Sequence, residues 1–237
     1  MDAPPKELDS KALSFKNCAT DLFFRIPEEK RNRILETAIN EFAQNGYAYA
    51  NVNRIAETAD ISVGALYNYF PTKDALFLYI VEVVATAIQQ QIDKILSSNI
   101  RFLSKLEKLL RTTQEQSKRT SSYTKLYNAF ASDNDMERAN ILAQRIEWVG
   151  AKAYYDMISQ AQKSGEIRSD IDPSLLAFML DNQLMTTQFS FACEYYRKRF
   201  SMYLGEADSS DEEYVINSIM KAFESMFLVV NPVNGTP

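Results

Sequence analysis

Histidine is absent from the 237 residues of this chain, and glycine, proline and cysteine are scarce. The absence of histidine removes the commonest general base and the commonest metal ligand. With 6 glycines and 7 prolines, turn signals are too few for a many-stranded sandwich or barrel. Cys18 and Cys193 lie far apart without a CxxC spacing. We therefore expect two reduced thiols, although counting alone permits one disulfide.

Long hydrophobic runs and the common catalytic signatures are missing too. The first residues carry no apolar stretch typical of a secretory signal, and residues 75–88 are interrupted by Glu82 and are too short to span a membrane. No P-loop, dinucleotide glycine fingerprint or nucleophile elbow is present. We expect a cytoplasmic protein that is not an enzyme, with no cofactor, metal or membrane partner. Catalysis by carboxylates alone stays open, although no paired acids stand out from the surface charge.

The charge is unevenly distributed along the chain. The net charge is −5, yet residues 25–73 hold six basic and six acidic side chains and are neutral. A nucleic-acid-binding face needs only a few well-placed cations. The overall acidity therefore permits DNA binding by this segment and does not demonstrate it.

Apolar residues recur at helical spacing along most of the chain. Hydrophobic residues make up 46% and charged residues 24%, as in an ordinary globular protein. The spacing between Ile34 and Phe42 predicts a helix that begins at Pro27 and ends at Asn45-Gly46. A second short helix follows Asn51 as its N-cap.

A tight turn and a third short helix come next. Residues 60–62 form the turn, Ser62 caps a helix over 63–69, and Pro71 ends it. Thr72 caps a long fourth helix. Further helices are predicted near residues 100–119, 121–132, 135–164, 173–204 and 211–230, with an acidic loop over 205–211.

The predicted fold is therefore all-α. It consists of an N-terminal three-helix helix-turn-helix domain followed by a larger helical domain. The predicted boundaries are a loosely held N-terminal extension over 1–24, a helix-turn-helix domain over 25–72, and a helical domain over 73–237.

The third short helix has the composition of a DNA-reading helix. Leu66 and Phe70, four residues apart, form an inward apolar edge, whereas Ser62, Gly64, Ala65 and Asn68 leave the opposite side small and polar. A helix in a major groove brings its backbone close to base edges and phosphates, and small residues permit that approach.

Residues 25–77 resemble the tetracycline-repressor (TetR) family of bacterial regulators. The most specific matches are Phe42-Ala43, Gly46-Tyr47, Ile55-Ala56, Ile61-Ser62, Gly64, Leu66-Tyr67, Tyr69-Phe70 and Lys73. The resemblance implies a homodimeric, ligand-responsive transcription regulator, most often a repressor. It assigns DNA binding to the helix-turn-helix domain over 25–72, and ligand (effector) binding and dimerisation to the helical domain over 73–237. Such a protein binds a palindromic double-stranded DNA operator and is released by a small-molecule effector.

The resemblance also assigns contacts to individual residues. The implied DNA-binding residues are Asn51, Ser62, Val63, Gly64, Ala65, Tyr67, Asn68, Tyr69 and Lys73. Asp60 replaces the usual glycine of the turn, so an aspartate in a left-handed conformation is expected there. Val63 and Ala65 replace frequent polar residues, and they could instead meet a thymine methyl group.

The last two long helices carry dense apolar positions. By resemblance, the same helices of two copies form a four-helix interface, whose expected residues are Met179, Met185, Val215, Ile219, Phe223 and Met226. A two-fold dimer places its two reading helices about 34 Å apart, or a multiple of that distance. The alternative is that these stripes are internal core.

Aromatic and polar side chains of the middle helices supply material for an effector pocket. The expected lining residues are Tyr123, Tyr127, Trp148, Tyr155, Asn182 and Phe189, with plain core packing as the alternative. A second alternative concerns the whole protein. A helical adaptor with this fold could act through protein partners and have lost DNA binding, because Val63, Ala65 and the neutral 25–73 segment weaken the case for DNA.

Overall fold

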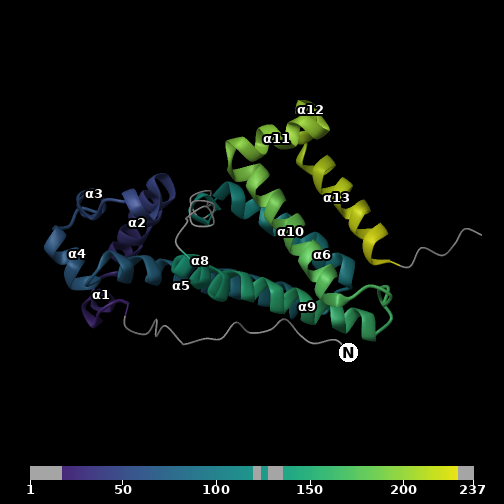
Figure 1. Cartoon of the computed structure of the whole chain (residues 1–237), viewed down its shortest axis with the longest axis horizontal. Coiled ribbons are helices and arrows are strands. Elements are labelled where there is room, and N and C mark those ends of the chain that lie inside the picture. Colours follow the sequence, from purple (N-terminus) through teal and green to yellow (C-terminus); the bar gives the residue numbers. More distant parts are fainter. Residues whose placement is uncertain (1–17, 120–123, 128–135, 229–237) are drawn as a thin grey trace, which may run out of the picture. The chain divides into compact units, whose positions relative to one another are not determined.

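The computed structural model describes residues 18–119, 124–127 and 136–228, which are predominantly helical (Figure 1). No strand occurs among the described residues, so the all-α prediction is confirmed. Both cysteines are free, as expected.

The described chain divides into two compact units. The N-terminal unit comprises residues 18–89, 124–127 and 136–149, and the C-terminal unit comprises residues 90–119 and 150–228. Two helical runs, α5 and the α8-to-α9 segment, therefore contribute residues to both units.

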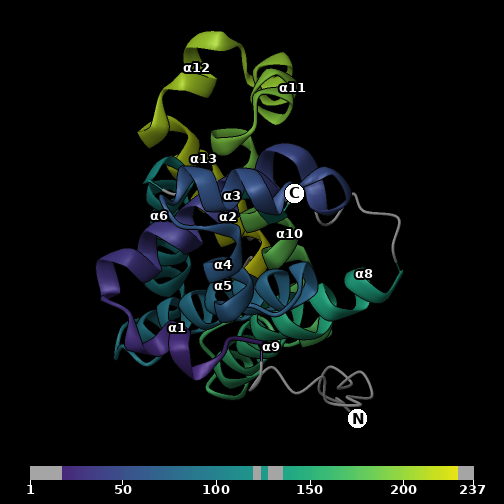
Figure 2. The same ribbon diagram turned by 90° about the vertical axis from the view of Figure 1, so that its left-hand side faces the viewer.

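The N-terminal unit is built from short and medium helices (Figure 2). Its elements are α1 (Asp21–Arg25), α2 (Glu28–Tyr49), α3 (Val52–Thr58), α4 (Val63–Tyr69), the first part of α5 (Lys73–Leu96), α8 (Met136–Leu142) and a π-helical segment, η2 (Ala143–Glu147). α3 and α4 form a helix-turn-helix, and each has buried residues on only one side.

An aromatic core holds these helices together. Phe23, Phe42, Phe70 and Phe77 are each exposed by 1% or less. The Phe23 ring lies 4.7 Å from the Phe70 ring, and the Phe42 ring lies 5.9 Å from Phe77 in a T-shaped arrangement. Such rings contribute both buried area and a preferred geometry, so they fix α1, α2, α4 and α5 against one another.

The start of the described chain corrects the prediction of a loose extension up to residue 24. Residues 21–25 form α1, and Phe23 is fully buried. The Thr20 N–H donates to the Tyr69 carbonyl at 2.9 Å, and the Thr20 hydroxyl donates to the Asn68 carbonyl at 2.7 Å. The polar composition predicts a loosely held segment, whereas one phenylalanine and two hydrogen bonds attach residues 20–25 to the end of α4.

α2 differs from its prediction at both ends. Pro27 is the N-cap with an extended ψ of 145°, so the helix begins one residue later, at Glu28. Gly46 has a φ of 65° as expected for a C-terminal glycine, yet helical turns resume over residues 47–49. Gly46 therefore produces a kink and not an end.

The C-terminal unit consists of longer helices. Its elements are the end of α5, α6 (Phe102–Arg119), most of α9 (Trp148–Lys163), α10 (Pro173–Ala192), α11 (Glu194–Leu204), α12 (Glu206–Ser210) and α13 (Glu212–Phe227). α6 packs against both α10 and α13.

Three predictions for the later segments of the chain need revision. The helix expected over 173–204 breaks at Cys193, which has an extended backbone. The loop expected over 205–211 contains the short helix α12. The helix expected over 135–164 is continuous but passes through the π-helical η2, while the one expected over 121–132 lies mostly outside the described residues.

Charged contacts attach α13 to α6. The Arg111 guanidinium donates to both carboxylate oxygens of Glu213, at 2.6 and 3.0 Å, and to Glu107 at 2.9 Å. The hydrogen bonds from Arg111 hold the pKa of Glu213 below its usual range. At the opposite end of the α6–α13 helix pair, the Phe102 and Phe227 rings lie 5.0 Å apart.

Among the described helices, α5 alone is long and apolar enough to cross a membrane by length and composition. A core helix can meet the same criteria, and length and composition are weak grounds by themselves. Leu76, Phe77, Ile80 and Val81 of α5 are buried in the core of the N-terminal unit.

We predict that Phe23→Ala destabilises the protein by about 3–5 kcal/mol, because it removes a fully buried ring from a packed core. The matched control is Phe24→Ala, since the Phe24 side chain is 55% exposed. Denaturant unfolding followed by circular dichroism measures both. Equal destabilisation by the two variants would show that α1 does not brace the core.

Candidate nucleic-acid interface

Helix caps and a left-handed residue form the α3-turn-α4 segment, as predicted from the sequence. The Asn51 side chain accepts from the Asn53 N–H at 2.9 Å, and the Ser62 hydroxyl accepts from the Ala65 N–H at 3.1 Å. Asp60 has a φ of 54°, the left-handed conformation expected for a residue replacing glycine. Both caps and the strained turn residue are confirmed.

α4 has two different sides. Leu66 and Phe70 are each 1% exposed and belong to the core, as predicted. Tyr67 is 45% exposed, and Ser62 and Asn68 are also exposed. The outer side therefore presents a small polar start followed by one tyrosine and one asparagine.

Three further candidate contact residues are more enclosed. Val63 and Ala65 are half-buried and pack against the core. Tyr69 is only 9% exposed, and its ring lies 6.0 Å from the Phe23 ring. These three side chains serve the core in the free protein, which leaves little of Tyr69 available to an outside partner.

Nothing within the described chain requires a glycine at position 64. A Cβ added at this position would meet no atom within 4 Å, and the residue is exposed. Its φ is not in the left-handed region, so neither packing nor backbone geometry requires glycine here. Open space above this glycine allows another backbone to approach α4 closely.

A buried carboxylate positions the start of α3. Glu41 on α2 is 6% exposed, and its Oε1 accepts from the Asn51 backbone N–H at 2.8 Å. Its Oε2 lies 3.1 Å from Nε of Arg54 on α3. The role of Glu41 was not predicted from the sequence, although an acid next to Phe42 on an apolar stripe is a signal that could have identified it.

Two arginines of α2 have structural partners. Arg33 donates to the Ala59 carbonyl at 2.9 Å and so supports the turn. Arg31 donates to the carbonyls of Ile26 at 2.7 Å and Phe24 at 3.2 Å. Their side chains therefore stabilise the helix-turn-helix framework.

Lys73 lies at the first residue of α5, directly after the Thr72 cap. The Thr72 hydroxyl accepts from the Ala75 N–H at 3.0 Å. The Lys73 ammonium donates to the Ala48 carbonyl at 3.3 Å and lies 4.7 Å from the centroid of the Tyr47 ring. Burial lowers the pKa of Lys73, with Asp74 acting in the opposite direction.

The residues expected to line an effector pocket are divided between the two units. Tyr127 and Trp148 belong to the N-terminal unit, whereas Tyr155, Asn182 and Phe189 belong to the C-terminal unit. Tyr123 lies outside the described residues.

Several of them have structural partners. The Tyr127 hydroxyl pairs with the Glu147 carboxylate, and Asn182 donates to the Phe178 carbonyl at 2.7 Å. Tyr155 and Phe189 are buried.

The described residues contain no group of three metal-ligating side chains.

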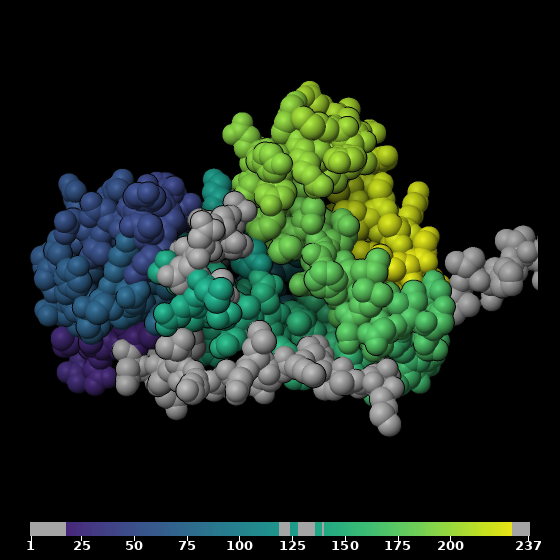
Figure 3. Space-filling view, in the orientation of Figure 1, coloured from purple at the N-terminus to yellow at the C-terminus, as the bar shows by residue number. Residues whose placement is uncertain are grey.

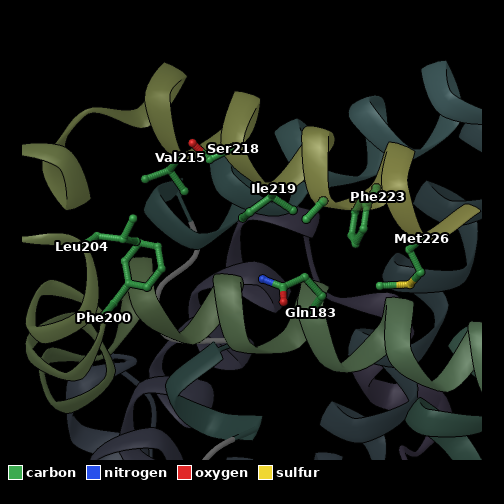
Figure 4. Close-up of a pocket in the computed structure, with 9 residues that line it drawn as sticks. Gln183, Phe200, Leu204, Val215, Ser218, Ile219, Phe223 and Met226 are labelled. Atoms are coloured by element: carbon green, nitrogen blue, oxygen red, sulfur yellow. The ribbon is translucent and has the colours of Figure 1, made fainter. Parts of the chain in front are cut away.

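An apolar pocket of about 200 Å³ does lie within the C-terminal unit, between α10, α11 and α13 (Figure 4). Its lining residues are Gln183, Phe200, Leu204, Val215, Ser218, Ile219, Ala222, Phe223 and Met226. None of the six expected pocket residues is among them. The lining includes four residues expected at the dimer interface, of which Val215 and Phe223 are 1% exposed.

The other two expected interface residues lie on α10. Met179 is 42% exposed and Met185 is half-buried. Leu175 and Phe178 are 51% and 65% exposed and lie next to Met179 in a helical stripe. α10 therefore presents an apolar stripe on the surface of its unit. Residues 173–192 fall in the green part of the surface in Figure 3.

Comparison with known proteins gives a consistent family assignment. Residues 34–80, which include α3, α4 and the start of α5, match the family described as "Bacterial regulatory proteins, tetR family". The HTH-type transcriptional regulator YuxN of Bacillus subtilis is 51% identical over 51 residues, 22% of this chain and 18% of YuxN. The regulator YhgD of the same organism is 25% identical over 152 residues, 64% of this chain and 78% of YhgD.

Solved structures share the fold over most of the chain. A TetR family regulator from Chloroflexus aurantiacus has a TM-score of 0.60 at 23% identity, covering 88% of this chain and 98% of that one. FadR from Bacillus subtilis, solved with stearoyl-CoA, has a TM-score of 0.63 at 15% identity, covering 80% and 95%.

The family match and the shared fold both include the helix-turn-helix described above. The helix-turn-helix region of this chain, residues 34–80, therefore resembles that of the TetR family of bacterial regulatory proteins.

Proposed function

We propose that this protein is a cytoplasmic, dimeric transcription regulator that binds a DNA operator through α3 and α4 and responds to a small molecule. The observation that carries the proposal is on the outer side of α4. Gly64 is exposed there, and neither packing nor backbone geometry requires a glycine at that position. A DNA-reading helix needs that clearance because its backbone must approach base edges in the major groove.

The proposed DNA contacts divide into two kinds. Asn51 and Lys73 flank the helix-turn-helix and would contact phosphates, which set position and affinity. Tyr67 and Asn68 are exposed on α4 and would meet bases or backbone, as would the residues from Ser62 to Ala65. Base contacts carry the sequence discrimination.

The proposed dimer uses the apolar stripe of α10 together with α13. Leu175, Phe178 and Met179 are all more than 40% exposed on one side of α10. Contiguous exposed apolar side chains mark association surfaces in soluble proteins. A two-fold dimer through this stripe would present two α4 helices to successive turns of an operator.

The proposed effector is an organic molecule with an apolar part, and acyl-CoA esters are the first class to test. Structures with the same fold were solved with such ligands, namely FadR with stearoyl-CoA and AibR with isovaleryl coenzyme A and operator DNA. A ligand can change DNA affinity only through different affinities for two states of the protein. We propose that repression of transcription is relieved when the effector binds.

The proposal is tested by selecting bound sites from a random duplex pool and measuring affinity against salt. We expect an enriched palindrome and an affinity that falls steeply as salt rises, because counterions are released from phosphates. An adaptor that acts through protein partners would bind little duplex at any salt concentration, and that outcome would contradict the proposal.

Gly64→Met is predicted to abolish operator binding without unfolding the protein. The added side chain meets open space in the free protein, so stability stays the same or rises by up to about 1 kcal/mol. It would nevertheless hold α4 away from the groove. Fluorescence anisotropy and thermal unfolding measure the two effects, with Gln160→Met at an exposed position of α9 as the control. Operator affinity equal to that of the control would contradict the prediction.

Lys73→Ala and Asn68→Ala are predicted to act differently on DNA binding. Lys73→Ala should weaken binding to every sequence and flatten the salt slope by about one unit. Asn68→Ala should relax discrimination at one position of each half-site by roughly 1–3 kcal/mol. Binding titrations on matched and mismatched operators separate the two effects. If both variants weaken all sequences alike, Asn68 does not read a base.

Phe178→Asp is predicted to convert the dimer to a monomer, because it places a charge in the middle of the apolar stripe on α10. Light scattering coupled to size exclusion gives the mass directly. Tyr195→Asp on α11, at a side chain that is 74% exposed, is the control. A wild-type mass equal to one chain, or a Phe178→Asp dimer, would exclude this interface.

A further inference from the structure

We infer that Arg138 of α8, far outside the helix-turn-helix in sequence, is a positioning residue that holds Lys73 in place for DNA. The inference rests on the proposed DNA-binding function. The guanidinium carbon of Arg138 lies 4.1 Å from the centroid of the Tyr47 ring, and the Lys73 ammonium lies 4.7 Å from the same centroid. One aromatic ring therefore binds two cations from different parts of the chain.

The Tyr47 ring is itself held firmly. It stacks on Phe42 with centroids 6.1 Å apart and an interplanar angle of 4°, and it meets Phe77 edge-on at 5.2 Å. Its hydroxyl donates to the Asp74 carboxylate, next to Lys73. The kink at Gly46 directly precedes this ring. Tyr47 therefore acts as a fixed platform for both cations.

Arg138 restricts where Lys73 can go. The Lys73 ammonium reaches the Ala48 carbonyl at 3.3 Å and lies near the ring that Arg138 also occupies. Like charges repel, and Arg138 acts with burial to lower the pKa of Lys73. Without Arg138, the Lys73 side chain could move across the Tyr47 ring and away from a DNA phosphate.

Arg138 has a defined location because α8 and η2 pack against the core of the N-terminal unit to which they belong. Ile141 and Leu142 are 6% and 5% exposed within its core cluster. In the π-helical segment, Arg145 Nη2 lies 2.8 Å from Glu82 Oε2 on α5. π-helical segments occur frequently at functional sites, and this one lies directly after the helix that carries Arg138.

Operator affinity tests the inference through a double-mutant cycle. We expect Arg138→Ala to weaken operator binding about threefold in the wild-type background and by less than about 1.5-fold in the Lys73→Ala background, since coupled residues are not additive. Lys125→Ala removes a charge from an exposed side chain of the same unit and controls for general electrostatics. The inference is overturned if Arg138→Ala matches Lys125→Ala, or if its effect persists when Lys73 is absent.

A second measurement needs no DNA and separates this inference from the proposed function. Reductive methylation with ¹³C labels lysine side chains while keeping their charge, and Lys73→Arg assigns the Lys73 resonance. We expect that resonance to move in Arg138→Ala and to stay in place in Lys125→Ala, because the ring shifts nearby signals. An unmoved Lys73 resonance in Arg138→Ala overturns the inference, whether or not the protein binds a duplex.

Discussion

The burial of Leu66 and Phe70 beneath α4 is the constraint on which the DNA-binding face depends. Each side chain is 1% exposed, and together they anchor the inner side of a helix only seven residues long. A helix this short has little stability of its own, so its orientation comes from tertiary packing. Once that side is buried, Ser62, Gly64 and Asn68 must face outward.

A polar framework adds precision to this packing. Glu41 accepts from the N–H of Asn51, the N-cap of α3, Arg33 supports the turn, and Thr20 donates to the last carbonyls of α4. Buried polar groups that are fully paired restrict a structure to one arrangement, because losing a partner leaves an unpaired group in a low dielectric. The helix-turn-helix is therefore held at its start, its turn and its end.

Local features of the fold could be predicted from the sequence. Asn51, Ser62 and Thr72 cap helices through bonds two or three residues away, and Asp60 adopts the left-handed turn conformation that its position demands. These outcomes depend on neighbours in the chain, which a sequence displays directly.

Features that depend on distant contacts could not be predicted in the same way. Phe23 looked like part of a polar extension, yet it is buried because α4 and α5 supply aromatic partners. Arg138 meets Tyr47 only in the folded chain. The break at Cys193 interrupts a run whose composition favours helix throughout. The expected effector pocket and dimer interface stay predictions for the same reason, since apolar helical stripes do not reveal what covers them.

Photo-crosslinking from position 67 tests the central claim most directly. Tyr67 is aromatic and 45% exposed on α4, so p-azidophenylalanine can replace it with little change in shape. On a duplex selected by the wild-type protein, we expect a covalent DNA adduct from position 67 and none from position 195 on α11. Adducts from position 195 alone, or from neither position on a duplex that the protein binds, would contradict the account.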